Sequence, residues 1–323
     1  MAVEETRIDS EGIQTTPLTS SLATPERITL LAFAVMVLFA GGAAVAVRIT
    51  FAELPPFWSG GARFGAAALI FWILMIIRRV PVPRGRAIAG AALFGFLGVG
   101  ASFLFLMWGL VETPAGLFQV FGALVPLLTI IFAFLHKLEK MRWQAVTGAL
   151  LAVAGIAFAV NGYRGAAISA PHIIAILIGT ACIAESAVVA KLIPRSHPIA
   201  TNAVGMTVGA VMLLGASLIA GESWIIPGKP ATWGAFIYLV VCVSVIVFML
   251  YLWVLERWTA SGTSFAFVLM PLVTISLAST IANEPVTSSL LVGAALVIAG
   301  VIFGAIVKPK KKKPRQTFEC KPC

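Results

Sequence analysis

Ten apolar stretches of about 20 residues, separated by short polar connections, dominate the chain. A helix of about 20 residues is long enough to cross the hydrocarbon core of a bilayer. Because 60% of the residues are hydrophobic and only 11% are charged, a water-soluble fold has too little polar surface to cover them. The sequence therefore predicts an all-α membrane protein of ten transmembrane helices. The expected spans are 28–47, 56–77, 87–110, 114–135, 143–160, 172–193, 199–220, 231–255, 261–282 and 285–307.

The cationic residues predict the orientation of these spans. A cytoplasmic N-terminus places most Lys and Arg inside, including the basic tail 308–323, and leaves only Arg48, Arg164 and Lys229 outside. Both termini are thus expected in the cytoplasm, with residues 1–27 as a disordered leader and not as a signal peptide. The net charge of +10 is scattered between apolar stretches, so we expect lipid and not nucleic acid as the partner.

The chain also resembles itself at an offset of 145 residues. Trp108 matches Trp253 and Pro126 matches Pro271; Glu139 matches Glu284 in the same way, and so do several glycines. We therefore expect two repeats, at 28–162 and 163–307. Because each repeat would hold five spans, the second repeat would be inverted relative to the first, an arrangement typical of transporters.

These motifs resemble the EamA-domain family of the drug/metabolite transporter superfamily over nearly the whole chain. The resemblance rests on Pro55-Pro56 followed by Arg63-Phe64, on Thr113-Pro114-Ala115 leading to Pro126, and on the doubled Glu and Gly positions. It implies ten helices in two inverted halves, export or exchange of small metabolites, and a bacterial inner membrane. Family members often carry Trp-Gly in the first helix, where this chain has Ala40-Gly41.

Two ionisable residues within the spans are candidates for binding substrate or protons. Glu185 is placed near the middle of the sixth span, where a charge is costly unless it faces a cavity or a partner. We hypothesise that it binds an amine or takes up a proton; the alternatives are a structural ion pair or a position nearer the cytoplasm. Arg63, in the second span, either attracts a carboxylate substrate, pairs with Glu185, or extends to the interface.

Other candidates come from helix faces and repeat positions. Gln119 and Ser264 belong to polar faces of the fourth and ninth spans that are expected to line a cavity or to pack helices. Pro126 and Pro271 on the same faces are candidate gating bends. Trp108 and Trp253 are interface anchors or cavity residues. Glu139 and Glu284 precede helices and are expected to cap helix ends.

The sequence indicates no enzyme chemistry. Its histidines form no ligand cluster, no nucleotide-binding motif is present, and Cys320 and Cys323 form only an isolated CxxC, so no metal, cofactor or ATP drive is expected. The leading hypothesis is a secondary transporter that exports a small amphipathic metabolite such as an amino acid or amine, with or without proton coupling. A non-transporting membrane receptor or scaffold is the alternative.

Overall fold

The computed structural model describes residues 27–138, 143–161, 169–194, 196–258, 260–282, 284 and 286–306. Every regular element within these ranges is helical, and they contain no strand. The leader up to residue 26, Glu139, and the tail with Cys320 and Cys323 lie outside the described residues.

Within the described ranges, eight helical segments are long and apolar enough to cross a membrane, which confirms the membrane-protein class. They are Arg27–Thr50, Pro56–Ile77, Arg86–Glu112, Ala115–Leu135, Ala170–Leu192, Pro198–Ile219, Pro230–Arg257 and Gly262–Ile281. Two further helices, α8 (Trp143–Asn161) and α15 (Ser288–Ile306), coincide with the fifth and tenth expected spans. Their apolar stretches, Val146–Val160 and Ser288–Phe303, are shorter.

The two halves are interrupted at matching places. In the third segment a π-helical stretch, Phe96–Ala101 (η1), joins α4 (Arg86–Gly95) to α5 (Ser102–Glu112). The eighth segment repeats this order, with η2 (Leu239–Val247) between α11 (Pro230–Tyr238) and α12 (Phe248–Arg257). π-Helical turns are rare and are frequently found at functional sites.

The fourth and ninth segments are also broken. The fourth divides into α6 (Ala115–Gly122) and α7 (Val125–Leu135), and the ninth into α13 (Ala260–Ser264) and α14 (Ala266–Ile281). Pro126 lies in the first turn of α7, where its missing N–H costs nothing, whereas Pro271 lies inside α14.

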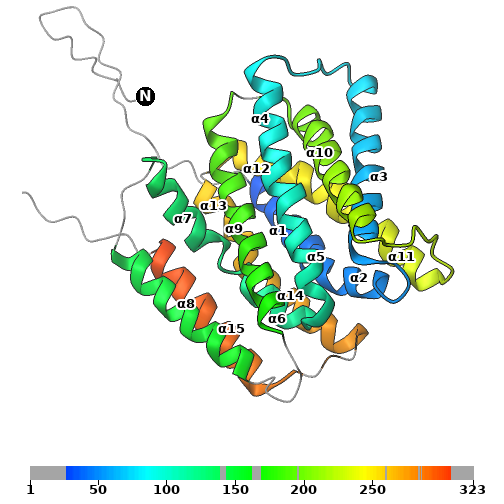
Figure 1. Ribbon diagram of the computed structural model, residues 1–323. Helices are drawn as coiled ribbons and strands as arrows, with labels where there is room; N and C mark the ends of the chain where they lie inside the picture. The colour runs from blue at the N-terminus through cyan, green and yellow to red at the C-terminus, as the bar shows by residue number, and fades with distance from the viewer. Residues whose placement is uncertain are drawn as a thin grey trace, which may run out of the picture.

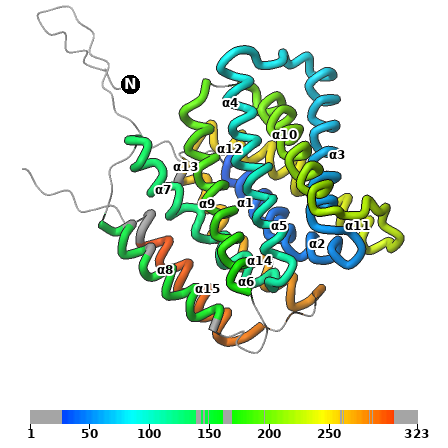
Figure 2. Tube along the Cα trace, viewed as in Figure 1, coloured from blue at the N-terminus to red at the C-terminus, as the bar shows by residue number. Residues whose placement is uncertain are grey.

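Helices of one half pack against helices of the other (Figure 1). These pairs include α3 (Pro56–Ile77) with α10 (Pro198–Ile219), α8 with α15, α5 with α9 (Ala170–Leu192), and α1 (Arg27–Gly41) with α14. Figure 2 shows α8 and α15 side by side along one flank of the bundle. Gly155 and Gly293 bring these two backbones together, because a Cβ at Gly293 would lie 2.6 Å from the Gly155 carbonyl oxygen.

Contacts along α9 show that the repeats run in opposite directions. The backbone beside His172, near the start of α9, lies against Gly109, whereas Ile193, just after α9, lies against Gly90. The first segment of the first repeat instead approaches Leu110 with its last turn, where Arg48 donates to the Leu110 carbonyl. The first segment of the first repeat therefore runs parallel to the third segment of the chain. The first segment of the second repeat, α9, runs antiparallel to that same third segment. We call the two ends of the bundle the Arg48 end and the Lys191 end.

Candidate functional site

A cavity of about 150 Å³ lies between the two halves. The first half contributes residues of α1, α2 (Ala43–Thr50), α3, α4, η1, α5 and α6, and the second contributes residues of α9, η2, α12 and α14. Its lining is mostly apolar, with Met36, Met107 and Met270 among several phenylalanines. Met and Phe side chains form adaptable apolar walls, so the cavity suits a small molecule with an apolar body.

Of the substrate-binding candidates from sequence, Arg63 and Gln119 line this cavity. Gln119 is buried, and its amide nitrogen lies 3.5 Å from the Met270 sulfur on the opposite wall. Ser264 is buried outside the cavity lining. The departure from the family pattern also falls here, because Ala40 is a wall residue.

Arg63 is held by neighbours from both halves. Its side chain is 1% exposed, and its Nε donates to the Ser244 hydroxyl on η2 at 2.8 Å. The guanidinium carbon lies 4.8 Å from the ring centre of Phe64 and 5.5 Å from that of Phe103. These contacts hold the guanidinium at the cavity wall.

Glu185 lies outside the lining of this cavity. Its Oε1 lies 2.6 Å from Nε2 of His136, the residue that follows α7. Glu185 precedes the end of α9 at Leu192 by seven residues, about 10 Å along the helix, so it lies toward the Lys191 end. The described ion pairs do not join Glu185 to Arg63.

The two tryptophans also lie outside the cavity lining. Trp108 is 40% exposed, and its ring centre lies 4.6 Å from that of His172. Trp253 stacks under the Arg257 guanidinium at 3.6 Å. Pro126 and Pro271 are both buried and do not touch the cavity.

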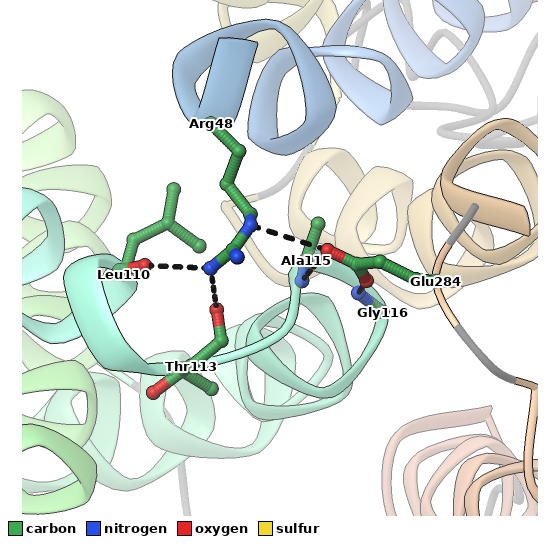
Figure 3. Close-up of polar contacts among 6 residues, drawn as sticks. All are labelled: Arg48, Leu110, Thr113, Ala115, Gly116 and Glu284. Atoms are coloured by element: carbon green, nitrogen blue, oxygen red, sulfur yellow. Dashed lines mark hydrogen bonds and ion pairs between the residues drawn. The ribbon is translucent and has the colours of Figure 1, made fainter. Parts of the chain in front are cut away.

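Arg48 and Glu284 form a polar contact that links the two halves at the Arg48 end (Figure 3). Arg48 Nε lies 3.2 Å from Glu284 Oε1, and Arg48 also donates to the carbonyl oxygens of Leu110 and Thr113. The same carboxylate accepts from the backbone N–H groups of Ala115 at 3.0 Å and Gly116. Glu284 thus caps α6, a helix of the other half, where its charge favours the positive helix end.

A related contact is present at the Lys191 end. Lys191 Nζ donates to the carbonyl oxygens of Leu255 and Trp258, which lie 145 residues after the two carbonyls that Arg48 binds, at 110 and 113. Glu139, the repeat partner of Glu284, lies outside the described residues. A cation therefore binds the connection between the third and fourth segments of each repeat.

Sequence reasoning missed Arg48 and Lys191 as contact residues because it used them only as charges that set the orientation of the spans. One signal was available: each is the last cation of the first span in its repeat. The π-helical stretches left no such signal.

The fold and the site define a class: a multi-span membrane protein made of two repeats with a cavity between them. The family model described as the EamA-like transporter family matches twice, at residues 27–161 and 170–305. The chain belongs to this family and is a membrane transporter, with a small-molecule substrate and a lipid bilayer as its environment.

Individual relatives agree with this assignment. The chain is 28% identical to the uncharacterized transporter YyaM of Bacillus subtilis, over 90% of this chain and 97% of the relative. It is 28% identical to the uncharacterized inner membrane transporter YedA of Escherichia coli K12, over 81% and 85%. A probable terminal-alkyne amino-acid exporter of Streptantibioticus cattleyicolor is 25% identical, over 68% and 74%.

A solved crystal structure has the same fold, with a TM-score of 0.64 and 19% identity over 87% of this chain and 99% of that one.

Proposed function

We propose that this transporter exports a small amphipathic metabolite, an amino acid or a related compound, by alternating access between its two repeats. The observation that carries the proposal is a cavity walled by both repeats, with a cation-centred contact at each end. Inverted repeats can exchange conformations, so that one end opens while the other closes around a central site.

The contact at the Arg48 end is a gate in this proposal, because it joins the two repeats. At the Arg48 end, Glu284 of the second repeat binds Arg48 and the start of α6, both in the first repeat. Opening this end separates the repeats and breaks these bonds. At the Lys191 end, Lys191 binds the start of the corresponding connection. The breaks before Pro126 and at Phe265 supply hinge positions in the segments that follow.

The cavity chemistry favours an amino acid over a simple amine. Its described lining contains no Asp or Glu, and Glu185, the acidic candidate from sequence, lies beside His136 instead. A bare amine would meet the positive charge of Arg63 without a compensating carboxylate. The name of the Streptantibioticus relative, a probable amino-acid exporter, supports both the substrate class and the direction.

Proton coupling is the part of the proposal that rests on Glu185. Its contact with His136 places two titratable groups together near the Lys191 end. A proton taken up by this pair during the cycle would couple transport to pH. Facilitated diffusion without a proton is the simpler rival.

Ten spans complete the proposed architecture, with α8 and α15 as the fifth and tenth. Both termini then lie in the cytoplasm and the Arg48 end faces outward, in an inner membrane such as that named for YedA.

The test is exchange in proteoliposomes that carry a pH-sensitive dye inside. Labelled phenylalanine or leucine should enter vesicles preloaded with the unlabelled compound. Net uptake of the same compound into vesicles without preload should change the internal pH, and E185Q should abolish that change. Net uptake without a pH change in wild type removes the coupling and keeps transport. Exchange no faster than in empty liposomes contradicts the proposed substrate class.

A further inference from the structure

Arg63 is a buried cation that lacks an anionic partner among the described residues. Its side chain is 1% exposed, and none of the described ion pairs includes it. Only Nε has a hydrogen-bond partner, the Ser244 hydroxyl, which is neutral. A charge at membrane depth is costly when nothing neutralises it, so such residues mark substrate or ion paths.

The two terminal nitrogens of Arg63, Nη1 and Nη2, are buried and have no hydrogen-bond partner. They belong to a residue of the cavity wall. Together they form the two-pronged donor edge that matches the two oxygens of a carboxylate. Because Ser244 and the rings of Phe64 and Phe103 hold the rest of the group, little side-chain freedom is lost when an anion binds.

A second orphaned polar group lies on the opposite half. The Tyr251 hydroxyl is buried and without a partner, and Tyr251 is also a wall residue. Buried hydroxyl and guanidinium groups without partners are rare, because each costs free energy that a bound polar group recovers. The remainder of the wall is mostly Met, Phe and aliphatic side chains.

We propose that Arg63 binds the carboxylate of the substrate, and that the substrate is a small monocarboxylate whose apolar or aromatic body fills the Met- and Phe-lined cavity. This inference rests on the proposed function and narrows it. The single described cation in the lining and the apolar wall suit one negative charge and not a phosphate dianion. Ser244 is then a positioning residue, since it touches only Nε.

The test measures binding apart from transport. Purified full-length protein is melted in the presence of phenylacetate, phenylacetamide, phenethylamine or L-phenylalanine at millimolar concentration. The two carboxylates should raise the melting temperature, and the amide and the amine should not. In R63Q and R63M the carboxylate affinity should fall roughly 10- to 100-fold, as for loss of a charged hydrogen-bonded pair.

Two controls separate binding from folding. Arg78→Gln removes an exposed cation at the end of α3, outside both the cavity wall and the gate, and should leave the carboxylate affinity within about twofold of wild type. Replacement of an unpaired buried charge by Met should not destabilise the empty protein. S244A keeps the charge and should weaken binding less than R63Q.

Equal stabilisation of R63Q and wild type by phenylacetate overturns the proposal. So does equal binding of the amide or amine, and so does failure of wild type to bind either carboxylate. Proteoliposome exchange distinguishes this from failure of the transport function. Equal exchange of a neutral or cationic compound by wild type and R63Q would support the transport function and contradict the carboxylate site. Carboxylate binding that depends on Arg63, without any exchange, would support the carboxylate site and contradict the transport function.

Discussion

Neutralising Glu284 should open the Arg48 end of the cavity. The Glu284 side chain is 14% exposed and accepts two backbone hydrogen bonds from α6 in addition to the Arg48 ion pair. In E284Q one amide oxygen remains as an acceptor and the charge is lost. Hydrogen bonds to a charged group contribute about 1.5–3 kcal/mol, and a partly exposed ion pair adds up to about 1 kcal/mol. We expect a net loss of about 2 kcal/mol from the closed form, or roughly a 30-fold shift toward the open form.

The assay is labelling of a cavity cysteine. Val47 is a buried wall residue near Arg48, so V47C is introduced into a background in which Cys182, Cys242, Cys320 and Cys323 are replaced. A membrane-impermeant thiol reagent is then applied at the Arg48 end. Where opening limits the reaction, E284Q should label about 30-fold faster than Glu284 protein.

Glu222 provides the matched control. It also caps a helix of the other half, through the N–H groups of Phe57 and Trp58 at the start of α3, but it does not touch α6. E222Q should lower the melting temperature without faster labelling of V47C. Equal labelling rates in E284Q and E222Q, or no change in E284Q, would refute the gate.

Three further predictions follow from other contacts. Gly293→Val should lower the free energy of unfolding by about 1–3 kcal/mol through overpacking, because its Cβ would lie 2.5 Å from the Ala159 Cβ. The melting temperature should fall with it, whereas Gly234→Ala, in open space, should leave the melting temperature unchanged. H136Q and E185Q should change the pH profile of exchange alike, because His136 Nε2 and Glu185 Oε1 are 2.6 Å apart. The double variant should exchange no more slowly than either single variant, whereas additive effects would mean that the two residues act separately. The Thr232 hydroxyl and the Lys229 N–H hold the pKa of Glu53 below its ordinary value. The contribution of Glu53 to stability is therefore present at neutral pH and lost as the pH falls through the lowered pKa. The difference in melting temperature between wild type and E53Q should shrink in acid, and a constant difference would contradict this.

Much of the architecture could be predicted from the sequence because apolar length alone determines where a helix can cross a bilayer. The second span was expected at 56–77, and α3 is Pro56–Ile77. The offset of 145 residues predicted two matching repeats, but not the π-helical stretches that interrupt the third and eighth segments. Length and composition of the described helices support eight spans and leave the fifth and tenth as proposals.

The candidate site was less predictable because side-chain partners depend on tertiary packing. A helical period places Gln119 on an inner face, but it does not show that Glu185 turns to His136 while Arg63 turns to Ser244. Proximity in sequence also suggested that Glu284 caps the helix that follows it. Its carboxylate instead accepts from the backbone N–H of Ala115 at the start of α6, 169 residues away in the sequence. Long-range polar contacts of this kind leave no periodic pattern.

Alternating access is tested most directly by locking the Arg48 end. R48C and E284C, in the background without other cysteines, are joined by a short cleavable bifunctional thiol reagent after reconstitution. The account predicts that exchange of labelled phenylalanine stops on cross-linking and returns on cleavage, while each single-cysteine protein is unaffected by the reagent. Exchange that continues at the original rate in the cross-linked protein would contradict it, because the repeats would then transport without separating at this end.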